Sequence, residues 1–109
     1  MRKTYKILSE EKCGIGHAMY MVGGKWKLII LYYLLLKERK FNELYSLLKS
    51  VTETTLNNNL KELIEDGLIE KVYLSNNPPR TIYKLTNKGH SLGTILINLR
   101  KFGQRELEK

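Results

Sequence analysis

Apolar residues recur at helical spacing along most of the chain. Within residues 14–22 they fall at positions i, i+3, i+4 and i+7, which predicts a short amphipathic helix that ends at the Gly23-Gly24 pair. Residues 25–37 predict a second helix, whose apolar side chains surround much of its circumference. A helix that is apolar on most sides is typical of the middle of a small domain, so we expect this one to form the centre of the core.

Two more helices are predicted close together. A short apolar pattern runs from Phe41 to Leu48, and a longer one covers residues 53–66, with Thr52 as its N-cap. Two helices joined by a short turn form a helix-turn-helix, here about residues 41–66. In DNA-binding proteins of this kind the second helix enters the major groove.

The periodicity changes after Gly67. Residues 68–74 alternate imperfectly in a β-rich pattern, residues 75–79 are turn formers, and residues 80–85 form a return strand. We therefore expect a β-hairpin with a long tip, which with its flanks spans about residues 68–86. A hairpin directly after a helix-turn-helix is a wing.

A final helix is predicted over about residues 87–107, with Thr86 as its N-cap. Its apolar stripe is longer than one small domain needs to cover its own core. These elements predict a mainly α-helical fold with a small β-hairpin (α+β), a winged helix-turn-helix. The 109 residues allow one such domain, over residues 1–109, with a small core.

The helix of residues 53–66 has a polar face rich in weak helix formers. Projected at about 100° per residue, Leu56, Leu60, Leu63 and Ile64 gather on one side, and the opposite side holds Thr54, Asn58, Lys61, Glu62 and Glu65. Thr and Asn, which are weak helix formers, occupy much of the rest. Short hydroxyl and amide side chains can pair with base edges and phosphates. We expect such residues, with three of the wing, to contact DNA: Thr52, Thr54, Thr55, Asn57, Asn58, Lys61, Asn76, Asn77 and Arg80. The alternative is a solvated polar surface that reads nothing.

The net charge of +8 favours a polyanionic partner, such as double-stranded DNA, although a membrane surface would also attract it. No apolar run approaches the roughly 20 residues of a membrane span, the longest being residues 28–36. The basic start of the chain is followed by Glu10 and Glu11 rather than by an apolar segment. We therefore expect no export signal, no membrane partner and a cytoplasmic location.

Few residues are suited to catalysis or metal binding. The single cysteine, Cys13, excludes an internal disulfide, and two histidines cannot build an ordinary zinc site alone. Cys13 and His17, at i and i+4, are at most half of a metal site between subunits. No phosphate-binding glycine loop, H-E-x-x-H or C-x-x-C motif occurs. We expect a protein that is not an enzyme and that uses no cofactor or metal.

Several short motifs, in order along the chain, resemble those of the HxlR-type bacterial transcriptional regulators, winged helix-turn-helix proteins related in architecture to the MarR group. They are Gly23-Gly24-Lys25-Trp26, Lys40-Phe41-Asn42-Glu43-Leu44 with Lys in place of Arg, Leu60-Lys61-Glu62-Leu63 followed by Asp66-Gly67-Leu68, and Pro78-Pro79-Arg80 followed by Tyr83, Leu85-Thr86 and Gly89. The resemblance covers about residues 13–102. It implies a sequence-specific transcriptional regulator, with Arg80 at phosphate or in the minor groove.

The resemblance also implies a homodimer on a roughly palindromic operator, with the N- and C-terminal helices packed across the two-fold axis. The apolar stripes of the first and last predicted helices fit that role, and their candidate interface residues are Ile15, Met19, Val22, Leu92, Ile95, Leu96, Leu99 and Phe102. The alternative is that these residues are buried within one protomer.

Cys13 stands where related regulators carry a cysteine that in some members senses electrophiles or oxidants, although here Gly14 replaces the usual proline. Nearby Lys12 and His17 could favour the thiolate, which is the reactive form. The resemblance thus makes Cys13 a candidate redox sensor. The alternative is an unreactive small apolar residue.

A second function class is a winged-helix module that binds RNA or protein without reading DNA, since fold does not determine function. Binding of single-stranded RNA would require exposed aromatic side chains for base stacking. The seven tyrosines mostly fall in apolar patterns, which favours duplex DNA. The sequence identifies no particular small-molecule effector.

Overall fold

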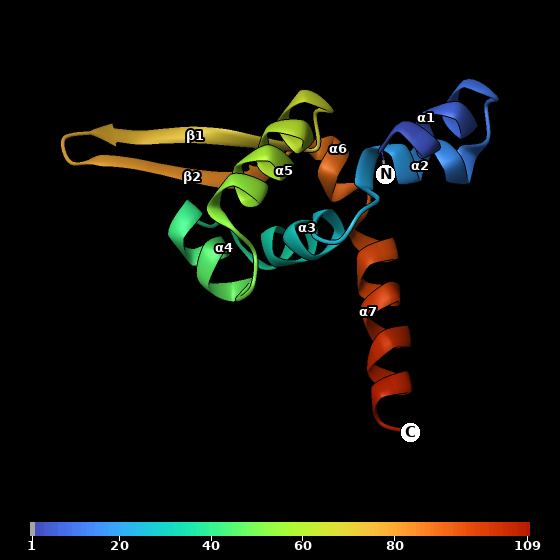
Figure 1. Cartoon of the computed structure of the whole chain (residues 1–109). Coiled ribbons are helices and arrows are strands. Elements are labelled where there is room, and N and C mark those ends of the chain that lie inside the picture. The colour runs from blue at the N-terminus through green and yellow to red at the C-terminus, as the bar shows by residue number, and fades with distance from the viewer. Residues whose placement is uncertain (1) are drawn as a thin grey trace.

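The computed structural model describes residues 2–109, apart from the side chains of residues 3, 4, 5 and 8. Its elements, in order, are α1 (Arg2–Glu10), α2 (Gly14–Val22), α3 (Lys27–Leu36), α4 (Phe41–Leu47), α5 (Glu53–Glu65), β1 (Ile69–Asn76), β2 (Pro79–Leu85), α6 (Asn87–His90) and α7 (Gly93–Leu107). In Figure 1, α1 and α2 lie at one end, the hairpin projects at the other, and α7 extends away from the body. The α+β winged helix-turn-helix fold is confirmed.

The core forms around α3, as the sequence predicts. Ile30, Leu31 and Leu34 of this helix are buried and pack with leucines of α4 and α5 and with residues of the hairpin. Trp26 and Phe41 are partly buried against the same cluster. Burial of apolar surface here is the main source of stability, because each fully buried side chain of this size contributes roughly 1.5–3 kcal/mol.

The wing is an antiparallel pair whose register runs from Ile69 opposite Leu85 to Asn76 opposite Pro79, with a shift between Tyr73 and Ser75. The predicted long tip is wrong, because strand pairing continues almost to the turn. Ser75 Oγ donates a hydrogen bond to the Pro78 carbonyl at 2.7 Å, which tightens the tip.

A short bridge ties the wing to the body. The Arg39 backbone N–H donates to the Tyr83 carbonyl at 3.0 Å, and the Tyr83 N–H donates to the Arg39 carbonyl at 2.7 Å. Arg39 lies between α3 and α4, so the connection before the helix-turn-helix serves as a minimal third strand. The base of the wing is therefore held beside α4.

The predicted helix of residues 87–107 is broken in the structure. It divides at Ser91 and Leu92 into α6 and α7. A Cβ atom on Gly89 would lie 2.1 Å from the Leu68 carbonyl oxygen, so only glycine allows α6 to pack this closely. The Leu92 N–H then bonds to the Gly89 carbonyl at 3.0 Å, a tight turn that redirects the chain into α7.

The structure also contains α1, which the sequence pattern did not indicate. It packs on α2 and connects to it through a turn in which Lys12 has a φ of 61°. Within residues 2–109, no single helix is long and apolar enough to cross a membrane. The consecutive pair α2 and α3 meets the length and composition criteria together, but with a bend of 77° between them.

Candidate nucleic-acid interface

The second helix of the helix-turn-helix, α5, has one face in the core. Leu56, Leu60 and Leu63 are almost fully buried. At its start, Thr52 Oγ1 accepts a hydrogen bond from the Thr55 N–H at 3.1 Å and donates to Thr55 Oγ1 at 2.9 Å. Thr52 is therefore the N-cap of α5, as the sequence predicted, and the Thr55 hydroxyl is bonded to it.

The opposite face of α5 is polar and open to solvent. Thr54, Asn57, Asn58 and Lys61 are all exposed. Asn59 differs from its two neighbours, because it is half-buried and its Nδ2 donates to the Thr55 carbonyl at 2.7 Å. The three consecutive asparagines thus divide into two that are available to a partner and one that is engaged by the helix itself.

The C-terminal half of α5 departs from the helical projection in two ways. Ile64, expected on the core side, is 38% exposed. Glu62, expected on the outer face, forms an ion pair with Lys27, whose side chain is almost fully buried. The hydrogen bond from Lys27, together with the charges of Lys27 and Arg2, holds the pKa of Glu62 below its usual range, against the opposing effect of partial burial.

Arg2 of α1 adds to this cluster. Its Nη2 lies 3.0 Å from Asp66 Oδ2, and its Nη1 lies 3.4 Å from Glu62 Oε1. Desolvation lowers the pKa of Arg2, but its hydrogen bonds to Asp66 and Tyr20 and the charges of Asp66 and Glu62 together outweigh this effect, so the pKa is raised overall. The sequence pattern does not reveal this cluster, because its members are far apart along the chain.

The wing presents the second part of the candidate interface. Asn76, Asn77 and Arg80 are exposed, as required for DNA contact. Arg80 borders a cleft that continues onto the start of α4, where Lys40 and Asn42 lie. Lys40 was noted in the sequence only as part of a motif. The structure makes it a neighbour of the wing arginine, so cations from two elements border one cleft.

Two tyrosines are more exposed than their apolar patterns indicate. Tyr73 on the wing is 70% exposed, and Tyr45 on α4 is 42% exposed. Lys71 Nζ lies 5.5 Å from the centre of the Tyr73 ring. By contrast, Tyr83 is buried in the core. The described tyrosines therefore supply some exposed aromatic surface, but on different elements.

The candidate dimer residues differ in their exposure to solvent. Ile15, Ile95, Leu99 and Phe102 are exposed, and Met19 and Leu92 are half-buried. Val22 and Leu96 are buried in the core of their own protomer, at 8% and 3% exposed, which fits the alternative of burial within one protomer.

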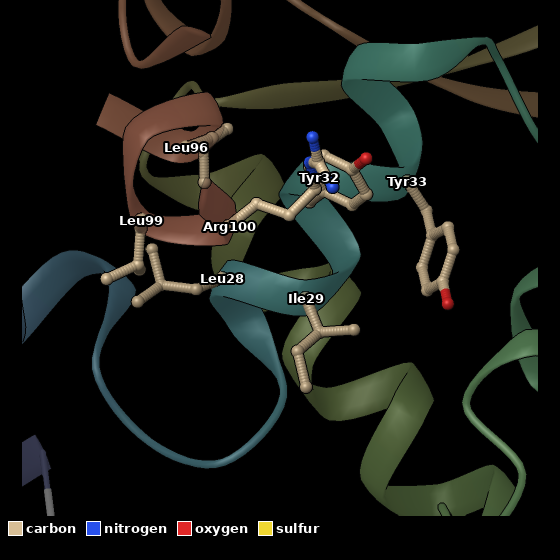
Figure 2. Close-up of a pocket in the computed structure, with 7 residues that line it drawn as sticks. All are labelled: Leu28, Ile29, Tyr32, Tyr33, Leu96, Leu99 and Arg100. Atoms are coloured by element: carbon tan, nitrogen blue, oxygen red, sulfur yellow. The ribbon is translucent and has the colours of Figure 1, made fainter. Parts of the chain in front are cut away.

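Where α7 leaves the body, it forms an open groove with α3. Figure 2 shows Leu28 of α3 and Leu99 of α7 facing one another, with the Arg100 side chain extending toward Tyr32. The groove has a volume of about 210 Å³ and is lined mainly by apolar atoms. The apolar surface of α7 is therefore continuous with that of the central helix.

Cys13 is exposed and is the N-cap residue of α2, where its Sγ accepts a hydrogen bond from the Gly16 N–H at 3.3 Å. The Nδ1 of His17 shares a hydrogen bond with Ser9 Oγ, and among the described residues no hydrogen bond joins His17 to the thiol. Among the residues that the structure describes, no three His, Cys, Asp or Glu side chains are grouped as metal ligands would be.

Comparisons with known proteins agree with this arrangement. The chain is 33% identical over 95 residues to the HTH-type transcriptional regulator YdeP of Bacillus subtilis, covering 87% of this chain and 74% of that protein. The solved structure of the redox regulator HypR in its oxidized form has a TM-score of 0.82 at 30% identity, covering 85% of this chain and 96% of that one.

The structure of the HTH-type transcriptional regulator ytcD is equally similar, with a TM-score of 0.82 at 31% identity, and 88% of this chain and 98% of that one are covered. These relatives are named as helix-turn-helix transcriptional regulators, and membership of such a family implies DNA binding. The model of the HxlR-like helix-turn-helix family matches residues 21–109. This chain is a transcriptional regulator of the HxlR-like helix-turn-helix family.

Proposed function

We propose that this protein is a sequence-specific regulator that binds duplex DNA as a homodimer, with α5 in the major groove and the wing on the adjacent backbone or minor groove. The observation that carries the proposal is the division of α5 into a leucine face in the core and an exposed face of short polar side chains. The groove-reading residues are Thr54, Asn57, Asn58 and Lys61, with Thr52 and Thr55 at the start of the helix.

The wing has a different role in this proposal. Arg80, with Asn76 and Asn77, contacts phosphates or the minor groove, which positions α5 without reading most of the sequence. Lys40 joins them because it borders the same cleft as Arg80. The net charge of +8 supports this part, since a basic protein gains affinity for DNA through release of counterions.

The homodimer is proposed from the exposed apolar residues of α2 and α7. Ile95 and Phe102 are 59% and 58% exposed, on a helix that projects from the body, as Figure 1 shows. A second copy that covers this surface would bury apolar area that is otherwise in water. Helix-turn-helix dimers place their two recognition helices about 34 Å apart, one turn of DNA, and a two-fold dimer with that spacing of its α5 helices would fit a palindromic operator.

A redox-sensing role for Cys13 is proposed from two observations. The thiol is exposed at the start of α2, and the chain is similar to HypR, a redox regulator. Oxidation at this turn would act next to the proposed dimer surface, where Ile15 lies.

We further propose that residues 1–109 act as one domain in the cytoplasm, with the helix-turn-helix at about 41–66, the wing at about 68–86 and the dimerisation segment at about 87–107.

The test begins with selection of duplexes from a randomised DNA pool by the purified protein. Fluorescence anisotropy then compares an enriched duplex with its scrambled sequence at physiological salt, before and after a thiol oxidant. We expect at least about 10³-fold discrimination, which is the lower range for specific regulators. Enrichment of a palindrome supports the dimer, and loss of binding on oxidation that Cys13→Ser prevents supports the sensor.

Equal and salt-sensitive binding to both duplexes would contradict sequence-specific reading. Single-stranded RNA is the third ligand in the assay, because Tyr73 and Tyr45 offer some surface for base stacking. Preference for the RNA over either duplex would favour the RNA-binding alternative.

A further inference from the structure

We propose that Arg2 and Lys27 position the recognition helix α5 through Glu62 and Asp66, so that the placement of α1 controls how well α5 reads DNA. The inference rests on the DNA-binding function proposed above and assigns it positioning residues that contact no DNA.

The Arg2 side chain of α1 contacts both α2 and the C-terminal end of α5. Its guanidinium bonds to both carboxylate oxygens of Asp66, at 3.3 and 3.0 Å, and to Glu62 at 3.4 Å. It also donates to the Tyr20 carbonyl at 2.9 Å and lies 4.1 Å from the centre of the Tyr20 ring. One side chain of α1 therefore joins α2 to the C-terminal end of α5, across more than 60 residues of sequence.

Lys27, the first residue of α3, is buried. Its side chain is 4% exposed, and its Nζ pairs with Glu62 Oε1. A buried ammonium without its partner carries a large desolvation penalty, so this pair strongly favours one placement of Glu62. Lys27 and Arg2 thus converge on the same carboxylate oxygen from two different helices.

The ion pairs of Glu62 and Asp66 also constrain the orientation of α5. The buried leucines of α5 fix its distance from the core, but hydrophobic contact is non-directional and tolerates small rotations of the helix. Charge-assisted hydrogen bonds depend on angle as well as distance. Glu62 lies one turn beyond Asn58 on the same rigid helix, so the ion pairs define the angle at which Asn58 meets a base edge.

The test uses Arg2→Gln, with Lys6→Gln as the matched control, because Lys6 is an exposed cation of the same helix and forms no ion pair with a described residue. Anisotropy is measured on the enriched and scrambled duplexes over a range of salt, well below the unfolding temperature. We expect Arg2→Gln to lower discrimination by roughly two- to thirtyfold, the range of coupling effects for residues outside a binding site. Lys6→Gln should leave discrimination unchanged.

The salt dependence separates positioning from direct contact. Loss of a phosphate contact would reduce the slope of log K against log salt by about 0.9, whereas a positioning residue leaves it equal to that of Lys6→Gln. Asp66→Asn provides a second variant that weakens the same link from α5. We expect its effect and that of Arg2→Gln to be non-additive in the double variant.

Three results would overturn the inference. They are a salt slope that falls for Arg2→Gln but not for Lys6→Gln, unchanged discrimination in both Arg2→Gln and Asp66→Asn, and purely additive losses in the double variant. A wild-type protein that does not discriminate between the duplexes would contradict the DNA-reading function itself, and so that failure is recognised separately.

Discussion

Replacing Asn58 and Asn59 by alanine, one at a time, tests whether the outer face of α5 reads bases. The two residues are adjacent, but Asn58 is exposed and forms no side-chain hydrogen bond with a described residue, whereas Asn59 Nδ2 donates to the Thr55 carbonyl at 2.7 Å. Asn58→Ala should therefore affect DNA binding and Asn59→Ala should affect mainly the helix.

The magnitudes follow from these contacts. A lost bidentate contact to a base costs about 1–3 kcal/mol, so Asn58→Ala should lower the ratio of affinities for enriched and scrambled duplex by roughly five- to 150-fold. Its folding stability should rise by a few tenths of a kcal/mol, about the difference in helix propensity. Asn59→Ala loses a hydrogen bond worth about 0.5–1.5 kcal/mol but gains a similar propensity term, so its stability should change by less than about 1 kcal/mol.

The assay is anisotropy on both duplexes, with urea denaturation of each variant to measure the free energy of unfolding. The expected pattern is loss of discrimination in Asn58→Ala with stability retained, and full discrimination in Asn59→Ala. An equal drop in affinity for both duplexes with Asn58→Ala would show that Asn58 contacts the backbone. Loss of discrimination in Asn59→Ala alone would refute the assignment of the two faces.

Three other changes test separate parts of the proposal. Arg80→Ala should weaken binding to every sequence and reduce the salt slope by about 0.9 if it removes one phosphate contact, as anisotropy over a salt series would show; an unchanged slope argues against that contact. Phe102→Glu should convert the proposed dimer into monomers, measured by sedimentation equilibrium, because it places a charge on the exposed apolar face of α7; a persistent dimer would place the interface elsewhere. Glu62→Gln should reduce the pH dependence of the folding stability in acid, because the pKa of Glu62 is lowered in the folded state. The stabilisation that ionised Glu62 provides is present above the ordinary pKa range of glutamate and is lost as the pH falls through the folded-state pKa. Thermal unfolding of wild type and variant at neutral and acidic pH measures this, and parallel pH profiles would contradict it.

Local periodicity predicted much of the fold because the core leucines recur at strict helical spacing. The start of α4 at Phe41 and the N-cap at Thr52 agree with the structure within a residue or two. The change of period after Gly67 likewise located the hairpin. These features depend on neighbours along the chain, which is the information that a sequence pattern contains.

The features that were missed depend on contacts between distant segments. The break at Ser91 lies beside the close approach of Gly89 to Leu68, a contact between segments about 20 residues apart that helical periodicity does not predict. Val22 and Leu96 continue apolar stripes, so the pattern alone could not distinguish burial within the protomer from an interface between copies. The exposed triplet Thr54, Asn57 and Asn58 was predicted because helical projection separates it from the buried leucines.

The polar face of α5 is tolerable because the stability of this helix comes from elsewhere. Five Thr and Asn residues in place of alanine cost roughly 2–3 kcal/mol in helix propensity. Burial of Leu56, Leu60 and Leu63 contributes roughly 5–9 kcal/mol, and the Thr52 cap and the ion pairs of Glu62 add to it. With its inner face, its start and its C-terminal end all held by the rest of the domain, the outer face of α5 is free to carry side chains chosen for hydrogen bonding. This is the physical reason why residues on the outer face of α5 can change without loss of the fold.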